Sequence, residues 1–180
     1  MRELIELASL LKETVTTPYS DLVTRPTGAA MRGRIEAKIQ ASPHPTAMLD
    51  FGAIRLLDFS CADEVVAKLL LSICGDRARC VVLVNLTETH REAIEHVLET
   101  HGLTVIGLME TDHRPEMIGW RTADLLLAFE AVQALGPGDS GRLAAALGWT
   151  VERAADALQS LALRGLVLAA SGTFRPLPIV

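Results

Sequence analysis

The segment Cys80–Leu86, which reads Cys-Val-Val-Leu-Val-Asn-Leu, most constrains what this chain can fold into. A near-continuous β-branched and aliphatic run of this length suits a strand that is covered on both faces, as in a parallel sheet. Two further apolar segments, Ala47–Phe51 and Leu103–Leu108, flank it in the chain, with helical patterns between them. Residues 22–108 therefore alternate strands and helices, which predicts an α/β domain with a mixed or mostly parallel sheet and helices packed on it.

Apolar spacing predicts the helices of this domain. Residues 2–14 and 28–41 carry apolar side chains at helical intervals, and residues 88–101 are followed by Gly102, a typical C-cap position. Another helix is expected after the first strand. Ser60 is predicted to cap it, because Asp63 lies three residues on and completes a capping box.

The pattern changes near the middle of the chain. Residues 109–120 contain turn-forming residues and are predicted to be a linker between a domain at 1–108 and one at 121–180. Three helices are expected at about 121–135, 139–147 and 150–164. Residues 165–177 then predict a β-hairpin around Ser171-Gly172. Three helices followed by a hairpin is the order of a winged helix.

The passage from Met48 to Val66, Met-Leu-Asp-Phe-Gly-Ala-Ile-Arg-Leu-Leu-Asp-Phe-Ser-Cys-Ala-Asp-Glu-Val-Val, resembles a STAS-like domain, the fold of anti-sigma-factor antagonists. In that family a strand ending in Asp leads through a turn to a second Asp and then to small residues that begin a helix. The resemblance covers roughly residues 20–108 and implies a regulatory protein partner of the anti-sigma-factor or kinase type. The positions that it marks as partner-docking residues are Asp58, Phe59, Ser60, Asp63 and Glu64.

Phe59 is a departure from that family, since the classical antagonists place their phosphorylated serine directly after the second Asp. A phosphorylation switch at that position is therefore not available here. The Ser60 hydroxyl is interpreted as a helix cap, with a regulatory phosphosite as the alternative. Asp63 and Glu64 either stabilise the first turn of the helix through its dipole or form fixed charges on a docking surface.

Arg121 to Leu177 resembles a winged helix-turn-helix, on Gly141–Thr150, Val151–Leu161 and Arg164–Leu168. Gly148 makes the tight turn, and Thr150 caps the second helix of the motif. Residues 123–180 hold four basic and five acidic side chains, a net charge of −1, whereas DNA-reading domains are usually basic. Protein interaction or dimerisation is therefore the alternative role. The residues that the resemblance places toward DNA are Arg142, Thr150, Arg153, Gln159 and Arg175.

No residue pattern supports an enzyme, a metal site or a cofactor. His90, His96 and His101 share one predicted helix, but their offsets of six and five residues leave no pair one turn apart. Cys61 is interpreted as a small buried residue, with redox sensing as the alternative. Cys74 and Cys80 flank a predicted turn at Gly75-Asp76 and are expected to be thiols at the edge of the core. No phosphate-binding loop is present.

Composition narrows the class further. Hydrophobic residues make up 49% of the chain and charged residues 22%, which is ample for packed cores, and the net charge of −5 gives no general attraction to nucleic acid. No apolar segment reaches the roughly 18 residues of a membrane span. We expect a cytoplasmic, non-enzymatic regulator, in transcription, without membrane contact or cofactor. One alternative is a small ligand such as a nucleotide bound beyond the strand ends, and another is a purely structural homodimer.

Overall fold

The computed structural model describes residues 2–16, 20–73 and 79–179 and divides the chain into two compact units, Met1–Trp120 and Arg121–Val180. The expected α/β class and mixed sheet are confirmed. The predicted turn at Gly75-Asp76 and Cys74 lie outside the described residues. None of the described helices is long and apolar enough to cross a membrane.

The first unit is built on a five-stranded sheet in the order β1-β3-β5-β6-β7. Strands β1 (Arg2–Glu6), β3 (Thr46–Asp50), β5 (Cys80–Leu86) and β6 (Thr104–Met109) run parallel, and β7 (Glu116–Gly119) is antiparallel to β6. Six of the seven residues of β5 are buried, as its apolar run predicted. A second, small sheet pairs β2 (Asp21–Leu22) with β4 (Leu56–Leu57).

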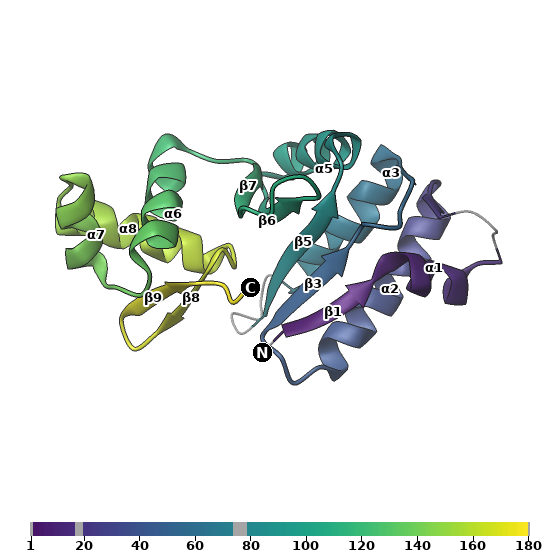
Figure 1. Cartoon of the computed structure of the whole chain (residues 1–180), viewed down its shortest axis with the longest axis horizontal. Coiled ribbons are helices and arrows are strands. Elements are labelled where there is room, and N and C mark those ends of the chain that lie inside the picture. Colours follow the sequence, from purple (N-terminus) through teal and green to yellow (C-terminus); the bar gives the residue numbers. More distant parts are fainter. Residues whose placement is uncertain (1, 17–19, 74–78, 180) are drawn as a thin grey trace. The chain divides into compact units, whose positions relative to one another are not determined.

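Helices connect the parallel strands of this unit. They are α1 (Leu7–Thr14), α2 (Arg25–Ala41), α3 (Phe59–Ala62), α4 (Leu69–Ile73) and α5 (Glu88–His101), and a π-helical segment η1 (Asp63–Lys68) joins α3 to α4. Neighbouring parallel strands joined by right-handed crossovers place their helices on the same face of the sheet. Figure 1 shows α2, α3 and α5 along one side of the strands. One aliphatic core lies between them and includes Leu11, Ile35, Leu49, Val66, Leu83 and Ile94.

Helix α2 begins at Arg25, three residues before the start that the sequence predicted, and two other segments form strands that were not expected. Residues 2–6 form β1 rather than the first turns of a helix, because they pair in register with β3, and Ile5 is buried while Leu4 is exposed. Pairing with a neighbouring strand here overrides a pattern that also fits a helix. Residues 116–119, expected within a linker, form β7, and the boundary between the units falls after Trp120.

The second unit has the expected order of three helices and an antiparallel hairpin. These are α6 (Ala123–Leu135), α7 (Ser140–Leu147), α8 (Val151–Leu163), β8 (Val167–Ala170) and β9 (Thr173–Pro176). Ser171 and Gly172 both have positive φ, as a two-residue hairpin turn of type I′ requires. Gly138 also bridges to Phe174, which ties the segment before α7 to the hairpin.

Candidate functional site

Phe59 lies on the surface at the start of α3, with 58% of its area exposed. It lines a cleft of about 390 Å³ between the start of α2, the start of α3 and one side of α5. The ring of His96 meets the ring of Phe59 edge-on, with the ring centroids 5.1 Å apart. We call this the Phe59 surface; its other lining residues are Arg25, Ser60, Asp63, Val97, Thr100 and His101.

Asp58 holds the two segments that build this surface. Its carboxylate accepts hydrogen bonds from the backbone N–H of Cys61 at 2.7 Å and of Thr24 at 3.0 Å, and from the Ser60 hydroxyl at 2.8 Å. Burial acts to raise the pKa of Asp58, but these hydrogen bonds outweigh it and hold the pKa below its usual value. Asp58 is therefore the N-cap of α3, and the prediction that Ser60 caps the helix is wrong.

The helix begins two residues earlier than the capping-box pattern indicated, with Asp58 rather than Ser60 as its N-cap, and this changes the role of Ser60. Its hydroxyl lies within the first turn and donates to Asp58 instead of accepting a backbone N–H. Asp63, expected to complete the capping box, lies in η1. Such π-helical segments are rare and occur frequently at functional sites.

Glu64 is only 3% exposed, and its buried carboxylate binds Arg25, one of the residues of the Phe59 surface. It accepts hydrogen bonds from Arg25 at 2.9 Å, from Arg32 at 3.3 Å and from Lys68. Burial acts to raise the pKa of Glu64, but these three cations lower it below its usual value. The Glu64 carboxylate is therefore enclosed by three cations of the same unit, and its role as a partner-docking residue stays a prediction.

Asp63 is partly exposed and joins the same network. Its carboxylate pairs with Arg25 at 2.7 Å, and His101 Nε2 lies 2.8 Å from its other oxygen. Burial acts to raise the pKa of Asp63, yet the hydrogen bonds from Arg25 and His101 keep this pKa below its usual value. No local sequence pattern joins these residues, because they come from α2, η1 and the end of α5, far apart in the chain.

The histidines of α5 and the thiol of Cys61 differ in burial and surroundings. His90 is buried, whereas His96 and His101 lie on the surface, and no group of three metal-ligating side chains occurs among the described residues. Burial raises the pKa of Cys61 to about 12, with a further contribution from the Asp58 carboxylate. A thiol with so high a pKa stays protonated near neutral pH, which favours the packing interpretation of Cys61 over redox sensing.

A second cleft, of about 240 Å³, lies at the carboxyl ends of β1, β3 and β5. It is the crevice in which the alternative reading expected a small ligand. Glu6 and Asp50 are paired in register there, and Asp50 accepts a hydrogen bond from the side-chain amide of Asn85 at 2.8 Å. Two neighbouring carboxylates disfavour the phosphates of a nucleotide.

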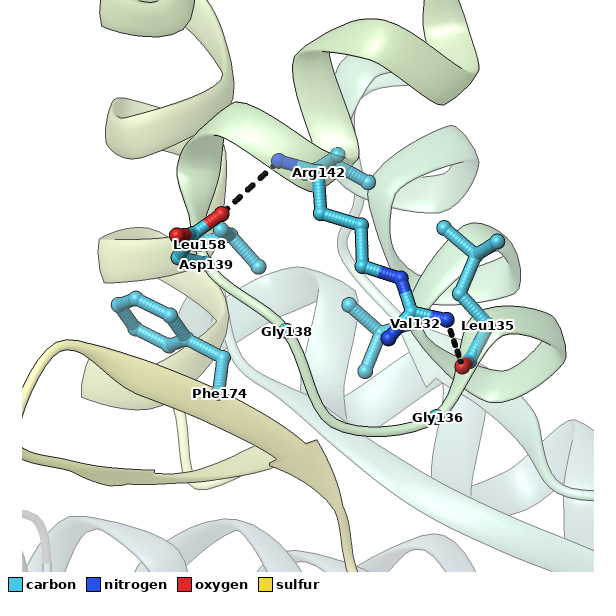
Figure 2. Close-up of a pocket in the computed structure, with 9 residues that line it drawn as sticks. Val132, Leu135, Gly136, Gly138, Asp139, Arg142, Leu158 and Phe174 are labelled. Carbon is cyan, nitrogen blue, oxygen red and sulfur yellow. Dashed lines mark hydrogen bonds between the residues drawn. The ribbon is translucent and has the colours of Figure 1, made fainter.

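In the second unit, the side chain of Arg142 closes a helix end. Figure 2 shows the guanidinium reaching the Leu135 carbonyl at the end of α6, 2.9 Å away, and it also donates to Pro137 O at 2.8 Å. Its backbone N–H is capped by Asp139. The adjacent apolar pocket holds only about 10 Å³, room for one water at most. Arg142 thus stabilises the loop before α7 in this structure.

The remaining residues expected to face DNA have different surroundings. Thr150 caps α8 by accepting the backbone N–H of Arg153. The Arg153 guanidinium makes two hydrogen bonds to Asp124, of 2.8 and 2.7 Å, and lies 4.2 Å from the centre of the Trp149 ring. Gln159 and Arg175 are exposed. Asp124, 29 positions earlier in the chain, neutralises Arg153, the one basic residue of α8.

No protein-family model, curated protein or solved structure matches the chain.

Proposed function

We propose that this protein is a non-enzymatic regulatory protein whose first unit, a STAS-like module, docks a partner protein through the Phe59 surface. In this proposal the second unit is a winged helix, and the protein takes part in transcriptional regulation. The resemblance of Met48–Val66 to the STAS-like family gives the class of partner, a regulatory protein of the anti-sigma-factor or kinase type. The observation that carries the proposal is the exposed Phe59 ring beside a cleft of about 390 Å³.

The surroundings of Phe59 support a docking role. Aromatic side chains that fill a central, desolvated position in an interface contribute disproportionately to affinity. Val23 and Leu56, also exposed, lie on or beside the paired strands β2 and β4, which lead into α2 and α3. The partly exposed carboxylate of Asp63 and the buried carboxylate of Glu64 both bind Arg25, which lines the same cleft as the Phe59 ring. A partner would therefore meet an ordered surface and lose little free energy in ordering it.

Site-specific photocrosslinking in the producing cells tests this proposal. A photoreactive phenylalanine analogue at position 59 should capture one regulatory protein, and the same analogue at Leu71, exposed on α4, should not. With that partner purified, Phe59→Ala should weaken binding about tenfold or more, and Leu71→Ala should leave it unchanged. Cells carrying Phe59→Ala should reproduce the transcript changes of a deletion. Equal capture at both positions, or full affinity of Phe59→Ala, would refute the proposal.

The crevice at the strand ends supports the alternative, a small-ligand module whose winged helix serves protein interaction or dimerisation. Its place at the carboxyl edge of parallel strands is where such ligands bind in α/β folds. Melting temperatures measured against a nucleotide and metabolite panel test it, since saturating ligand stabilises the folded state. A shift that Asp50→Asn abolishes would favour this function, and a panel without any shift would count against it.

A further inference from the structure

The second unit carries a groove between the start of α6 and the exposed side of α8, with a volume of about 370 Å³. Its walls hold Asp124 and Leu125 from α6 and Arg153, Asp156 and Ser160 from α8. Helix α8 is the one that the winged-helix resemblance places against DNA. The charges of the groove decide whether a nucleic acid fits it.

Negative charge dominates this groove. The only cation in its walls, Arg153, is bound through two hydrogen bonds by Asp124, so the two charges cancel. Asp156 lies in the wall, and Glu152 lies one helical turn before it. No arginine, lysine or histidine of the described ranges 2–16, 20–73 and 79–179 pairs with Glu152 or Asp156. Their uncompensated charge repels phosphates and attracts a cationic side chain.

Apolar side chains lie close to the same groove. Leu127, 44% exposed, is three residues after Asp124 on α6, and Leu163, 57% exposed, is three residues after Ser160 on α8. Residues three apart on a helix are neighbours on its surface. The face therefore combines exposed leucines with unpaired carboxylates, a combination that a protein segment of alternating basic and apolar residues complements.

We infer that the groove between α6 and α8 binds a basic segment of a protein partner, with arginine or lysine side chains on Asp156 and Glu152 and apolar side chains on Leu127 and Leu163. This surface belongs to the second unit, and the inference is independent of the Phe59 surface. It assigns protein recognition to the helix on which DNA contact was expected.

The probes are a short peptide of alternating arginine and leucine, the same peptide with glutamate for arginine, and a random DNA duplex. Each is added to the ¹⁵N-labelled full chain. The basic peptide should shift the backbone amides of Asp124, Asp156 and Ser160, and the other two probes should not. The variant E152Q/D156N should weaken binding about tenfold. The control E92Q/E99Q, which removes two exposed carboxylates of α5 in the first unit, should bind within about twofold of the unaltered protein.

The inference is overturned by equal losses in the two double variants, since attraction would then reflect only net charge. It is equally overturned when the basic peptide leaves the α8 amides unmoved. Duplex DNA that shifts those amides and loses affinity steeply with salt would restore DNA as the ligand.

Discussion

Asp58 and Thr24 are thirty-four positions apart in the chain, yet one carboxylate oxygen of Asp58 accepts the backbone N–H of Thr24 at 3.0 Å. The other oxygen caps α3 through Cys61 N. The same side chain thus fixes the residue before Arg25 and the helix that begins at Phe59. Two exposed side chains of the Phe59 surface, those of Arg25 and Phe59, are therefore positioned by a residue that is not among the residues lining that surface.

Asp58→Ala should destabilise the first unit by about 1–3 kcal/mol, because the partly buried N–H of Cys61 loses its helix cap and the N–H of Thr24 loses its acceptor. Denaturant unfolding measures this change. Since the pKa of Asp58 is lowered in the folded state, its contribution is present above the unfolded pKa near 4 and is lost as the pH falls through the folded pKa. The free energy of unfolding of Asp58→Asn should therefore fall less steeply with decreasing pH below about 4. A fall as steep as that of the unaltered protein would contradict the role of the Asp58 carboxylate as a cap.

Thr24 has φ 74° and ψ 139°, a region that β-branched residues rarely adopt. Thr24→Gly should relieve this strain and raise the free energy of unfolding by about 1 kcal/mol. Thr27→Gly is the matched control, because it also removes the hydrogen bond between the two hydroxyls but lies within α2. The control should lose stability. A Thr24→Gly variant that is no more stable than the control would show that the backbone there is unstrained.

Gly28 and Gly33 lie on the same helix and offer a second matched pair. A Cβ atom at position 28 would lie 3.0 Å from Cys61 Cα and from Glu64 Cβ, whereas position 33 has open space. Gly28→Ala should cost about 1–3 kcal/mol through overpacking. Gly33→Ala should gain up to about 1 kcal/mol, since alanine favours the helix. Thermal unfolding of both variants tests this, and equal effects of the two substitutions would exclude close packing of α2 on α3.

The elements with the strongest local patterns were predictable from the sequence. The apolar run of β5, the glycines at the ends of α5 and α7 and the Thr150 cap of α8 indicated those elements within a residue or two. Local pattern does not distinguish a strand from a helix in a segment as short as Arg2–Glu6, where pairing with β3 decides. The segment Glu116–Gly119 was predicted to be part of a linker because turn-forming residues surround it. It forms a strand through its pairing with β6, which no local pattern indicates.

The candidate sites were predictable only in part. The motif around Asp58 and Phe59 located the Phe59 surface, because its residues are close in sequence. The cap on α3 was assigned to Ser60, since a capping box and an aspartate cap two residues earlier give similar patterns. Pairs such as Arg25–Asp63 and Arg153–Asp124 join distant segments, and no local pattern indicates them.

His90 is 1% exposed and its Nδ1 accepts the backbone N–H of Thr87, so the folded state requires the neutral ring. Burial lowers its pKa, and attraction to the Ile54 carbonyl and the Glu110 carboxylate does not cancel the shift. The unfolded chain therefore binds more protons below about pH 6.5, and stability is lost as the pH falls from there toward the folded pKa.

Unfolding between pH 5 and 8, a range that spans the unfolded pKa of about 6.5, measures this loss. His90→Gln keeps an acceptor at the third helical position, as in a capping box, but does not titrate. Its stability should vary less with pH than that of the unaltered protein. The same slope in both proteins would assign the pH dependence to other groups.

Asp124 determines whether Arg153 is available to phosphates. Removing one charge from the pair leaves the guanidinium without its bidentate acceptor, so Asp124→Asn should increase retention of random duplex DNA at low salt. The unaltered protein should be retained weakly, because Glu152 and Asp156 flank the same helix face. Asp139→Asn removes one carboxylate from the same unit without freeing Arg153 and is the control. Retention should fall steeply with salt wherever it reflects phosphate contacts. If both variants gain retention equally, net charge alone explains the effect, and the Asp124–Arg153 pair does not limit contact between Arg153 and DNA phosphates.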